Sequence, residues 1–476
     1  MIRTNTSLYP YQQEAFDKLR RLKIGALYME MGTGKTRVTV ELIKYRLERG
    51  KITKALWLCP CSVKDNLRAD LIYHCGEVPP EIRIEGIESI SGSDRLYLSL
   101  LEYISDGACM LIVDESNLVK NHRAKRTERI TDIAGRLTYK LILNGTPVSR
   151  NEADLFAQWY LLDPEILGYK SYYSFAANHL EFYTYKDEHG VKRVNRNRIV
   201  RVLNVDYLTA KIALYSYQIK KSETGIKLPD KVYHTYDFSL TCEQYENYYY
   251  TRDYWLGAFA DEGDDTAIYK MFTALSHVTS GRRITTEFDE KMETEDVFAD
   301  IEDNPRICTL RGILDRIGKE QCIIFCRYQK EVEEIMELIR RRGQESAEFT
   351  GQLNVKKREE SLARFRNGTQ FLVANKACGA YGLNLQFCHN IIFYDNDFNY
   401  ATRAQAEDRI HRLGQEHTCH IYDICADNTF DGFVLDNLNK KVNLVEAFKK
   451  WLKKFRKKKE ITPDMIQSDT DVKKAS

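Results

Sequence analysis

The stretch from residue 27 to residue 36 carries the side chains needed to hold a polyphosphate. An apolar strand there runs into a glycine turn and then a helix, through Gly32, Thr33, Gly34, Lys35 and Thr36. Glycines let backbone amides wrap phosphate oxygens, a helix N-terminus favours their negative charge, and a lysine at this place reaches the outer phosphates. The Thr36 hydroxyl is placed to hold Mg²⁺. The sequence therefore predicts a nucleoside triphosphate site, in a variant form because Met29 stands where the strict pattern has glycine.

A second stretch supplies the acids that hydrolysis of a Mg-nucleotide needs. The apolar run at 108–113 ends in Asp114 and Glu115. Asp114 would hold Mg²⁺ through water, and Glu115 would orient and deprotonate the attacking water. A strand that ends in an acidic turn is the simpler interpretation, but with Lys35 upstream we favour the catalytic one.

A glutamine near the start of the chain fits the same site. Gln12 opens a helix whose apolar residues recur at helical spacing, and it precedes the phosphate loop. A glutamine amide can both donate to and accept from an adenine edge, so Gln12 is a candidate reader of the base.

Residues 401–415, ATRAQAEDRIHRLGQ, place two arginines at helical spacing. On a helix, Arg409 and Arg412 share one face, and two fixed guanidinium groups can neutralise charge on a transferring γ-phosphate. By charge pattern alone, a solvated helix in which Glu407 pairs with Arg403 would be favoured.

The composition is that of an ordinary globular protein long enough for two or three domains. The chain has 476 residues and a net charge of only +2, so a polyanion partner must meet local basic patches. Its start lacks an apolar signal core, and no apolar run approaches the ~20 residues of a membrane span. The twelve cysteines show no CxxC pair, which favours buried thiols over zinc ligands. We expect a cytoplasmic protein that makes no membrane contact.

The elements that must position these residues alternate between strands and helices. Apolar strands are expected near residues 27, 55–59, 108–113 and 141–144, and in a second series near 322–326, 347–351, 371–374 and 391–394. Such alternation predicts α/β sheets of parallel strands, with ligands bound at the strand ends. The second series has no Gly-Lys-Thr loop, so it is not expected to hydrolyse ATP independently.

Two regions fall outside this alternation. Residues 236–300 crowd tyrosines on an expected helix and are then acidic. A packing face is favoured there over base stacking, and the acidic part is interpreted as a solvated excursion. From Phe448 the chain reads FKKWLKKFRKKKE, a basic helix with an apolar stripe. It could grip phosphates or dock its aromatic face on the second lobe, and both interpretations stay open.

Taken together, the ordered motifs resemble a superfamily 2 helicase core, and specifically its SNF2-like branch. They are LYPYQ, MEMGTGKT, LIVDES, NGTPVSRNEADLF, IIFCR, FTG, GAYGLNL and QAEDRIHRLGQ, and the linker IKKSETGIKLPDKV resembles the family's as well. The ending Gly414-Gln415 is the most specific, because it separates the SNF2 branch from DEAD-box helicases. The match runs from Leu8 to about Lys441.

The resemblance implies two RecA-like parallel-sheet lobes in tandem, with a partly helical insertion between them and a basic C-terminal helix. The expected divisions are 1–165, the ATP-binding lobe; 166–304, a linker or insertion; 305–446, the second lobe; and 447–476, the tail. ATP would lie between the lobes and DNA, in duplex form, across their upper faces. Members typically translocate on double-stranded DNA.

The resemblance also assigns roles residue by residue. Gln12 would read adenine, the loop from Gly32 to Thr36 and Asp114 would hold phosphates and Mg²⁺, and Glu115 would activate water. Arg409 and Arg412 would be arginine fingers, and Gly382 would line the cleft. The DNA backbone would meet four residues: Pro60, Ser62, Thr350 and Gly351.

The chain departs from the family pattern at several places. Asn117 stands where the family usually has histidine, Tyr28-Met29 replaces a small-acidic pair, and Cys378 and Ala380 loosen the glycine motif. No chromatin-reading or zinc module is found, which favours a stripped-down enzyme acting on DNA in a bacterium or encoded by a virus. Two alternatives remain: an unwinding helicase directed to RNA or single strands, and a nucleotide-binding scaffold with weak turnover.

Overall fold

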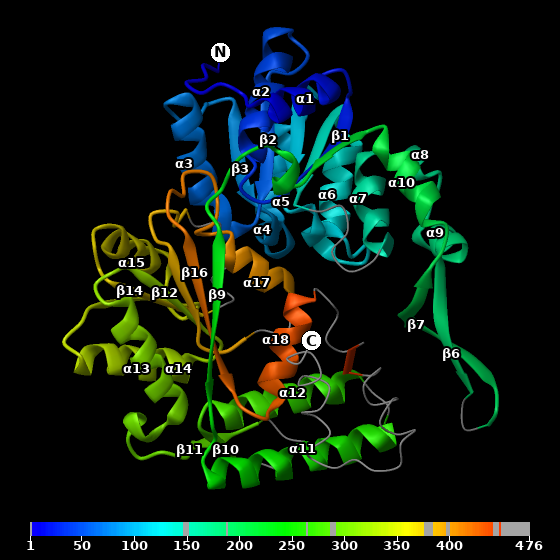
Figure 1. The fold of residues 1–476 in the computed structure, drawn as a ribbon. Helices are drawn as coiled ribbons and strands as arrows, with labels where there is room; N and C mark the ends of the chain where they lie inside the picture. The colour runs from blue at the N-terminus through cyan, green and yellow to red at the C-terminus, as the bar shows by residue number, and fades with distance from the viewer. Residues whose placement is uncertain are drawn as a thin grey trace. The chain divides into compact units, whose positions relative to one another are not determined.

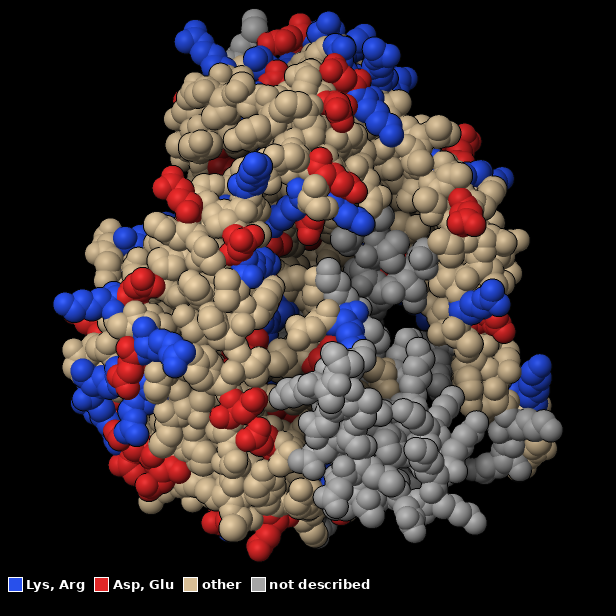
Figure 2. Space-filling view, viewed as in Figure 1, with Lys and Arg blue, Asp and Glu red and all other residues tan. Residues whose placement is uncertain are grey.

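The chain forms two compact units, Met1–Lys227 and Leu228–Ser476, each built on its own sheet (Figure 1). The computed structural model describes residues 2–145, 152–186, 189–262, 265–285, 292–375, 384–396, 400–440 and 447–448. Within these ranges no helix is long and apolar enough to cross a membrane. On the face drawn in Figure 2, basic and acidic side chains are interspersed, in keeping with the small net charge.

The first unit contains a six-stranded sheet in which every strand pairs in parallel. Its spatial order is β3 (Ile82–Gly86), β2 (Lys54–Cys59), β4 (Cys109–Val113), β5 (Tyr139–Asn144), β1 (Ile24–Met29) and β8 (Ser216–Ile219). The four predicted strands of this unit are confirmed. The two edge strands, β3 and β8, were not predicted.

Alternate residues of these strands feed two cores, one on each face of the sheet. One core takes Leu27, Trp57 and Ile112, and the other takes Tyr28, Leu58 and Val113. Because both faces are covered, the strands read as continuous apolar runs. The helices of this unit are α1 (Pro10–Leu19), α2 (Lys35–Glu48), α3 (Lys64–Cys75), α4 (Ile87–Gly92), α5 (Asp94–Tyr103), α6 (Lys125–Gly135), α7 (Leu155–Leu162), α8 (Pro164–Leu167), α9 (Tyr172–His179) and α10 (Val205–Ala213).

A two-stranded antiparallel hairpin leaves the first unit after α9 (Figure 1). Its strands are β6 (Leu180–Lys186) and β7 (Lys192–Val202). Phe182 and Ile199, at its base, pack against the core of the unit. The sequence suggested only that this region is basic in places.

The second unit repeats the architecture with a second all-parallel, six-stranded sheet. Its order is β13 (Ser346–Phe349), β14 (Phe371–Asn375), β12 (Cys322–Cys326), β15 (Asn390–Phe393), β16 (Cys419–Ala426) and β9 (Lys231–Phe238). The four predicted strands are confirmed, while β9 and β16 were missed. A small antiparallel pair joins β10 (Arg282–Ile284) to β11 (Thr294–Asp296).

Helices also cover both faces of the second sheet, since its alternate residues belong to two separate cores. Tyr248 and Trp255, on the tyrosine-rich helix, are 4% and 5% exposed within one core, which confirms the packing interpretation for these two side chains. Phe448, at the start of the basic tail, packs on the same core. The helices are α11 (Cys242–Glu262), α12 (Asp265–Thr279), α13 (Pro305–Ile317), α14 (Gln329–Arg341), α15 (Val355–Arg366), α17 (Tyr400–Glu407) and α18 (Phe430–Asn439).

The segment 166–304, predicted as a linker or insertion, contributes to both units. Strand β8 completes the first sheet, whereas β9, α11 and α12 pack in the second unit. The chain passes between the compact units at Lys227–Leu228. The functional division at 165, 304 and 446 stays a prediction.

A fully buried arginine ties several elements of the second unit together. Arg306, near the start of α13, pairs with Asp431 and donates to Thr279 Oγ1 and the Tyr394 carbonyl, both at 3.2 Å. Its guanidinium also lies 5.2 Å from the centre of the Phe238 ring. One side chain thus connects α13 with β9, α12, β15 and α18.

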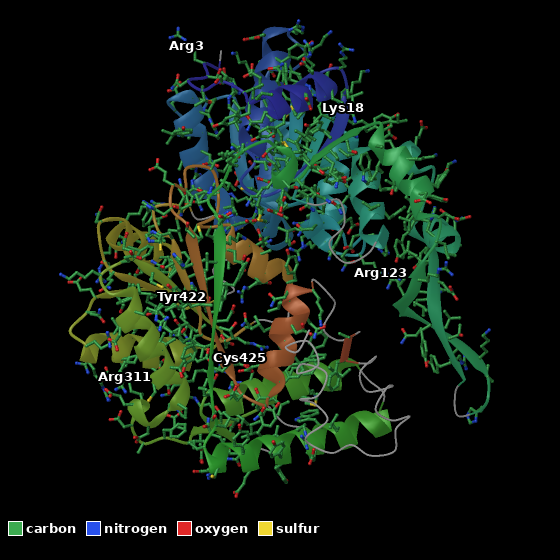
Figure 3. All side chains as sticks on the ribbon, viewed as in Figure 1. Arg3, Lys18, Arg123, Arg311, Tyr422 and Cys425 are labelled. Atoms are coloured by element: carbon green, nitrogen blue, oxygen red, sulfur yellow. The ribbon has the colours of Figure 1, made fainter. Side chains whose placement is uncertain are left out.

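We predict that Arg306→Ala destabilises the second unit by about 3–5 kcal/mol, because Asp431 loses its buried partner. The midpoint of urea unfolding, followed by circular dichroism on the full chain, measures the loss. Arg311→Ala is the matched control on the same helix, since its side chain lies at the outer surface (Figure 3) and pairs with the exposed Glu302. A midpoint for Arg306→Ala equal to that of Arg311→Ala would contradict the assignment.

Candidate functional site

The phosphate loop connects β1 to α2 as the sequence predicted. Gly32 and Gly34 adopt positive φ angles of 77° and 85°, which turn the backbone into the first turn of the helix. Lys35 is the first residue of α2, and its Nζ donates to the Met29 carbonyl at 2.9 Å. The ammonium is therefore folded back over the loop, where a phosphate would lie.

Gln12 lies directly against this loop. Its Nε2 donates to the Thr33 carbonyl at 2.9 Å, the Tyr11 hydroxyl donates to the same carbonyl at 3.0 Å, and the side chain is only 2% exposed. A Cβ added at Gly34 would come within 2.2 Å of Gln12 Nε2. Gly34 is thus required by both its backbone angle and this close approach.

The two acids follow β4, which is separated from β1 in the sheet by β5 alone. Burial and next the charge of Glu115 raise the pKa of Asp114, while Lys35 acts in the opposite direction. Lys35 thus interacts electrostatically with Asp114, although the two residues are 79 positions apart in the sequence. The structure brings the predicted loop and acids together at one edge of the first sheet.

Glu115 has an unusual backbone conformation. Its φ of 48° lies in the left-handed region, and its amide donates to Asp114 Oδ1 at 2.9 Å. Non-glycine residues rarely adopt this conformation, which costs energy and tends to occur at functional sites. The turn directs the chain away from the strand immediately after the two acids.

The residues that follow show what replaces the family's histidine. Ser116 is fully buried and donates to Gln158 Oε1 at 2.5 Å. Asn117 Oδ1 is buried and finds no hydrogen-bond partner among the described residues. Asn117 Oδ1 can therefore accept a hydrogen bond from a group outside the described residues.

Glu30 binds the backbone of the segment that leads out of the first unit. Sequence reasoning did not identify this residue. Its amide donates to the Ile219 carbonyl at 3.1 Å, and its Oε2 accepts from the Lys221 amide at 2.7 Å. The phosphate loop is therefore fastened to the start of the predicted linker. The acid in the motif MEMGTGKT was the available signal.

The four candidate DNA contacts occupy strand ends in their respective units. Pro60 follows β2 and is buried, and Ser62 lies half-buried in the short helix Cys61–Val63. Thr350 and Gly351 follow β13. Thr350 is fully buried and donates to Glu348 Oε1 at 2.6 Å, whereas Gly351 is exposed. Buried Pro60 and Thr350 thus shape these loops, and Ser62 and Gly351 offer accessible surface.

The predicted helix over 401–415 is wrong in its second half, because α17 ends at Glu407. Tight turns follow, in which the amides of Arg409 and Gln415 donate to carbonyls three residues back. The Arg409 carbonyl accepts from the Leu385 amide at 3.1 Å and cannot serve a helix. Arg409 is 8% exposed, and Arg412, half-buried, donates to Asn384 Oδ1. Turns, not a shared helical face, set the positions of the two arginines.

A buried ionic network fixes α17 beneath these turns. Arg403 pairs with Asp423 and, at 2.9 Å, with Glu407, and its guanidinium lies 3.8 Å from the Phe393 ring centre. Burial opposes the charged form, but Asp423 and Glu407 raise the pKa of Arg403. The predicted pairing of Glu407 with Arg403 is confirmed, although the pair is buried instead of solvated.

The side chains of Gln415 and His411, in the same motif, form hydrogen bonds to backbone groups of neighbouring segments. Gln415 Nε2 donates to the Cys388 and Ile410 carbonyls, and Oε1 accepts from two backbone amides, at 2.9–3.2 Å. His411 Nε2 lies 2.8 Å from the carbonyl of Pro229 in the linker. The ending that identified the motif in the sequence therefore anchors the segment that leads into β16.

Three predicted features lie outside the described residues. They are Gly382 with most of the motif GAYGLNL, residues 146–151 of the motif NGTPVSRNEADLF, and the tail beyond Phe448.

A strand, glycine turn and helix carrying Lys35, in the same sheet as a strand that ends in two acids, define a P-loop nucleoside triphosphatase. The family models agree over most of the chain: an SNF2-related domain matches residues 81–288, and the helicase conserved C-terminal domain matches residues 306–414. A model of the type III restriction enzyme res subunit matches residues 5–66. The chain belongs to the SNF2-like branch of helicase superfamily 2, and is an ATP-hydrolysing enzyme of that family.

Curated relatives and solved structures resemble most of this chain. An uncharacterized ATP-dependent helicase, YqhH, of Bacillus subtilis is 25% identical over 92% of this chain and 78% of its own length. The ATP-dependent helicase brm of Drosophila melanogaster is 24% identical over 94% of this chain, which spans 29% of that protein. The SWI2/SNF2 ATPase core of Sulfolobus solfataricus in complex with dsDNA is 20% identical over 93% of this chain and 92% of its own, with a TM-score of 0.40.

We predict that Gln12→Ala weakens ATP binding roughly fivefold, because the Thr33 carbonyl loses one of its two buried donors and each such bond contributes ~1 kcal/mol. Titration of a fluorescent ATP analogue gives the dissociation constant. The neighbouring Gln13→Ala is the control, since Gln13 is exposed and its amide donates to Asp17. Equal affinities for the two variants would mean that Gln12 does not support the nucleotide site.

Proposed function

We propose that the chain is a DNA-stimulated ATPase that uses ATP hydrolysis to translocate on double-stranded DNA. The observation that carries the proposal is the convergence of Gln12, Lys35 and the two acids at one edge of the first sheet. Family models for both helicase halves match the same chain, and a relative is described as an ATP-dependent helicase. Membership of the SNF2-like branch, whose members typically translocate on double-stranded DNA, supports the choice of substrate.

The proposed roles follow from what each side chain can reach and donate. The loop amides and Lys35 bind the β- and γ-phosphates, and Gln12 holds the loop. To read the adenine edge, Gln12 would exchange its bonds to the Thr33 carbonyl and the Tyr9 amide for bonds to the base. Glu115 orients the attacking water and accepts its proton. The turn after α17 offers Arg409 and Arg412 to the transferring phosphate.

The residues present fit a Mg²⁺ ion, which this family uses with ATP. Thr36 and Asp114 provide the hard oxygen ligands that Mg²⁺ prefers, and such sites take few protein ligands because phosphates and water complete them. Burial and next the charge of Glu115 raise the pKa of Asp114, and a bound cation would favour the charged carboxylate. When bound, the ion neutralises charge on the phosphates.

We further propose that the loops of Pro60, Ser62, Thr350 and Gly351 meet the DNA backbone through Ser62 and Gly351, while the buried Pro60 and Thr350 shape these loops. The protein would work wherever that DNA is, in a cell's cytoplasm or nucleoid or during infection by a virus. Gly382 would line the nucleotide cleft. The domain division at 165, 304 and 446, and a DNA-contacting tail, belong to the same proposal.

The decisive measurement is the steady-state ATPase rate without nucleic acid and with duplex DNA, single-stranded DNA or RNA. We expect the strongest stimulation by duplex DNA. Lys35→Ala should abolish turnover because the outer phosphates lose their cation, and Glu115→Gln should abolish it while retaining ATP binding. Stimulation by single strands or RNA alone would replace the proposal with an unwinding helicase. Absent turnover with normal ATP affinity would indicate a scaffold.

Arg412→Ala should lower the stimulated rate by roughly 10³-fold or more, the effect of losing an arginine finger, while ATP affinity changes little. The rate and the affinity are measured separately, by phosphate release and by analogue titration. Arg366→Ala, at the exposed end of α15, is the control. A drop in affinity that accounts for the whole loss of rate would show that Arg412 binds the ground state.

A further inference from the structure

The hairpin β6–β7 is a ribbon whose outer part has no core beneath it. Beyond Phe182 and Ile199, the described side chains are exposed on both faces of the ribbon, including Tyr185 at 46% and Val194 at 53%. A two-stranded ribbon without a covering layer is marginally stable in water. A segment that protrudes in this way (Figure 1) has surface on both faces for a partner outside the chain.

The ribbon is strongly basic in an almost neutral protein. Between residues 180 and 202 the chain has six basic residues, Lys186, Lys192, Arg193, Arg196, Arg198 and Arg201, against three acidic ones, Glu181, Asp187 and Glu188. The described side chains of Lys192, Arg193, Arg196 and Arg201 are all exposed. Since the whole chain carries only +2, this local excess of +3 is a positive patch and not part of a global field.

The pairing register places these charges at defined points. Tyr185 pairs with Arg193 and Tyr183 with Asn195, so these four side chains share one face. The register then slips, because Phe182 pairs with Ile199, and residues 196–198 of β7 bulge between the two pairs. Arg196 follows the last regular pair, at the start of the bulge, and its side chain is exposed.

The base of the ribbon is fixed to the first unit. The Leu203 amide donates to the His179 carbonyl at 2.7 Å, and the His179 ring lies 3.0 Å from the Leu203 carbonyl and 2.8 Å from the Tyr169 hydroxyl. His179 is only 1% exposed. The base of the basic ribbon is therefore anchored to the first unit through a buried histidine.

We propose that the β6–β7 ribbon binds duplex DNA, with Arg193 and Arg196 on phosphate oxygens. Basic side chains bind the oxygens of the DNA phosphates. The major groove of duplex DNA is wide enough to admit a two-stranded β-ribbon. Tyrosine hydroxyls and Asn195 are further donors to phosphate. The inference rests on the proposed function for the choice of duplex, and it adds a contact surface outside the helicase motifs.

The test compares the ribbon variant Arg193→Gln/Arg196→Gln with a control variant, Arg49→Gln/Lys51→Gln. The control removes two exposed charges just after the C-terminus of α2, the end of the helix that is far from the phosphate loop. Anisotropy of a labelled duplex, titrated at several salt concentrations without ATP, gives the dissociation constant and its salt slope. We expect the ribbon variant to bind about tenfold more weakly, with a slope lower by about 1.8, since each phosphate contact contributes about 0.9. The control should match the wild type, and Arg193→Lys/Arg196→Lys should restore the slope.

The outcomes separate this inference from the proposed function. If the wild type binds duplex DNA and the ribbon variant binds equally well with the same slope, the ribbon assignment is overturned and the proposed function stands. The ribbon assignment is also overturned if the variant loses affinity only for RNA or single strands. If the wild type itself neither binds duplex DNA nor is stimulated by it, the proposed function fails first. An unchanged DNA-independent ATPase rate and melting temperature show that the variant is folded.

Discussion

Parallel pairing of all six strands in each sheet is the constraint on which the rest of the structure depends. Parallel strands point their carboxyl ends to the same edge, so loops from distant parts of the chain must meet there. In the first unit this edge gathers the phosphate loop after β1 and the acids after β4. In the second it gathers the Thr350 turn after β13. The candidate nucleotide site of the first unit therefore lies at one edge of its sheet, whereas the candidate arginines of the second unit lie in turns after α17.

The phosphate loop is shaped by contacts from outside it as much as by its own glycines. Gln12 and Tyr11 hold the Thr33 carbonyl, and Gly34 leaves no room for a side chain beside Gln12. These contacts explain how a loop with Met29 in place of a glycine keeps the required turn. The variant position ends a buried strand and is itself fully buried, so its side chain serves the core.

Sequence reasoning found the strands that read as continuous apolar runs and the residues at their ends, but not β16, a buried strand whose apolar run is interrupted by His420 and Asp423. It missed β9, an edge strand with mostly exposed or half-buried residues that pairs with β16 across almost two hundred positions. It also extended α17 too far. Helical spacing in 401–415 was real, but the Arg409 carbonyl accepts from the amide of Leu385, which lies outside this segment. Such tertiary competition for backbone groups cannot be read from local spacing.

The linker joins the two sets of motifs through hydrogen bonds that no motif predicts. At its start the Lys221 amide is bound by Glu30 of the phosphate loop, and at its end the Pro229 carbonyl is bound by His411 between the two candidate arginine fingers. Lys231, immediately beyond, pairs with Glu407 at the end of α17. Each anchor is a neighbour of a residue proposed to handle phosphate. A shift of the phosphate loop or of the arginine turn must therefore either move the linker or break one of these bonds, so the short segment between the units is mechanically connected to the chemistry of both.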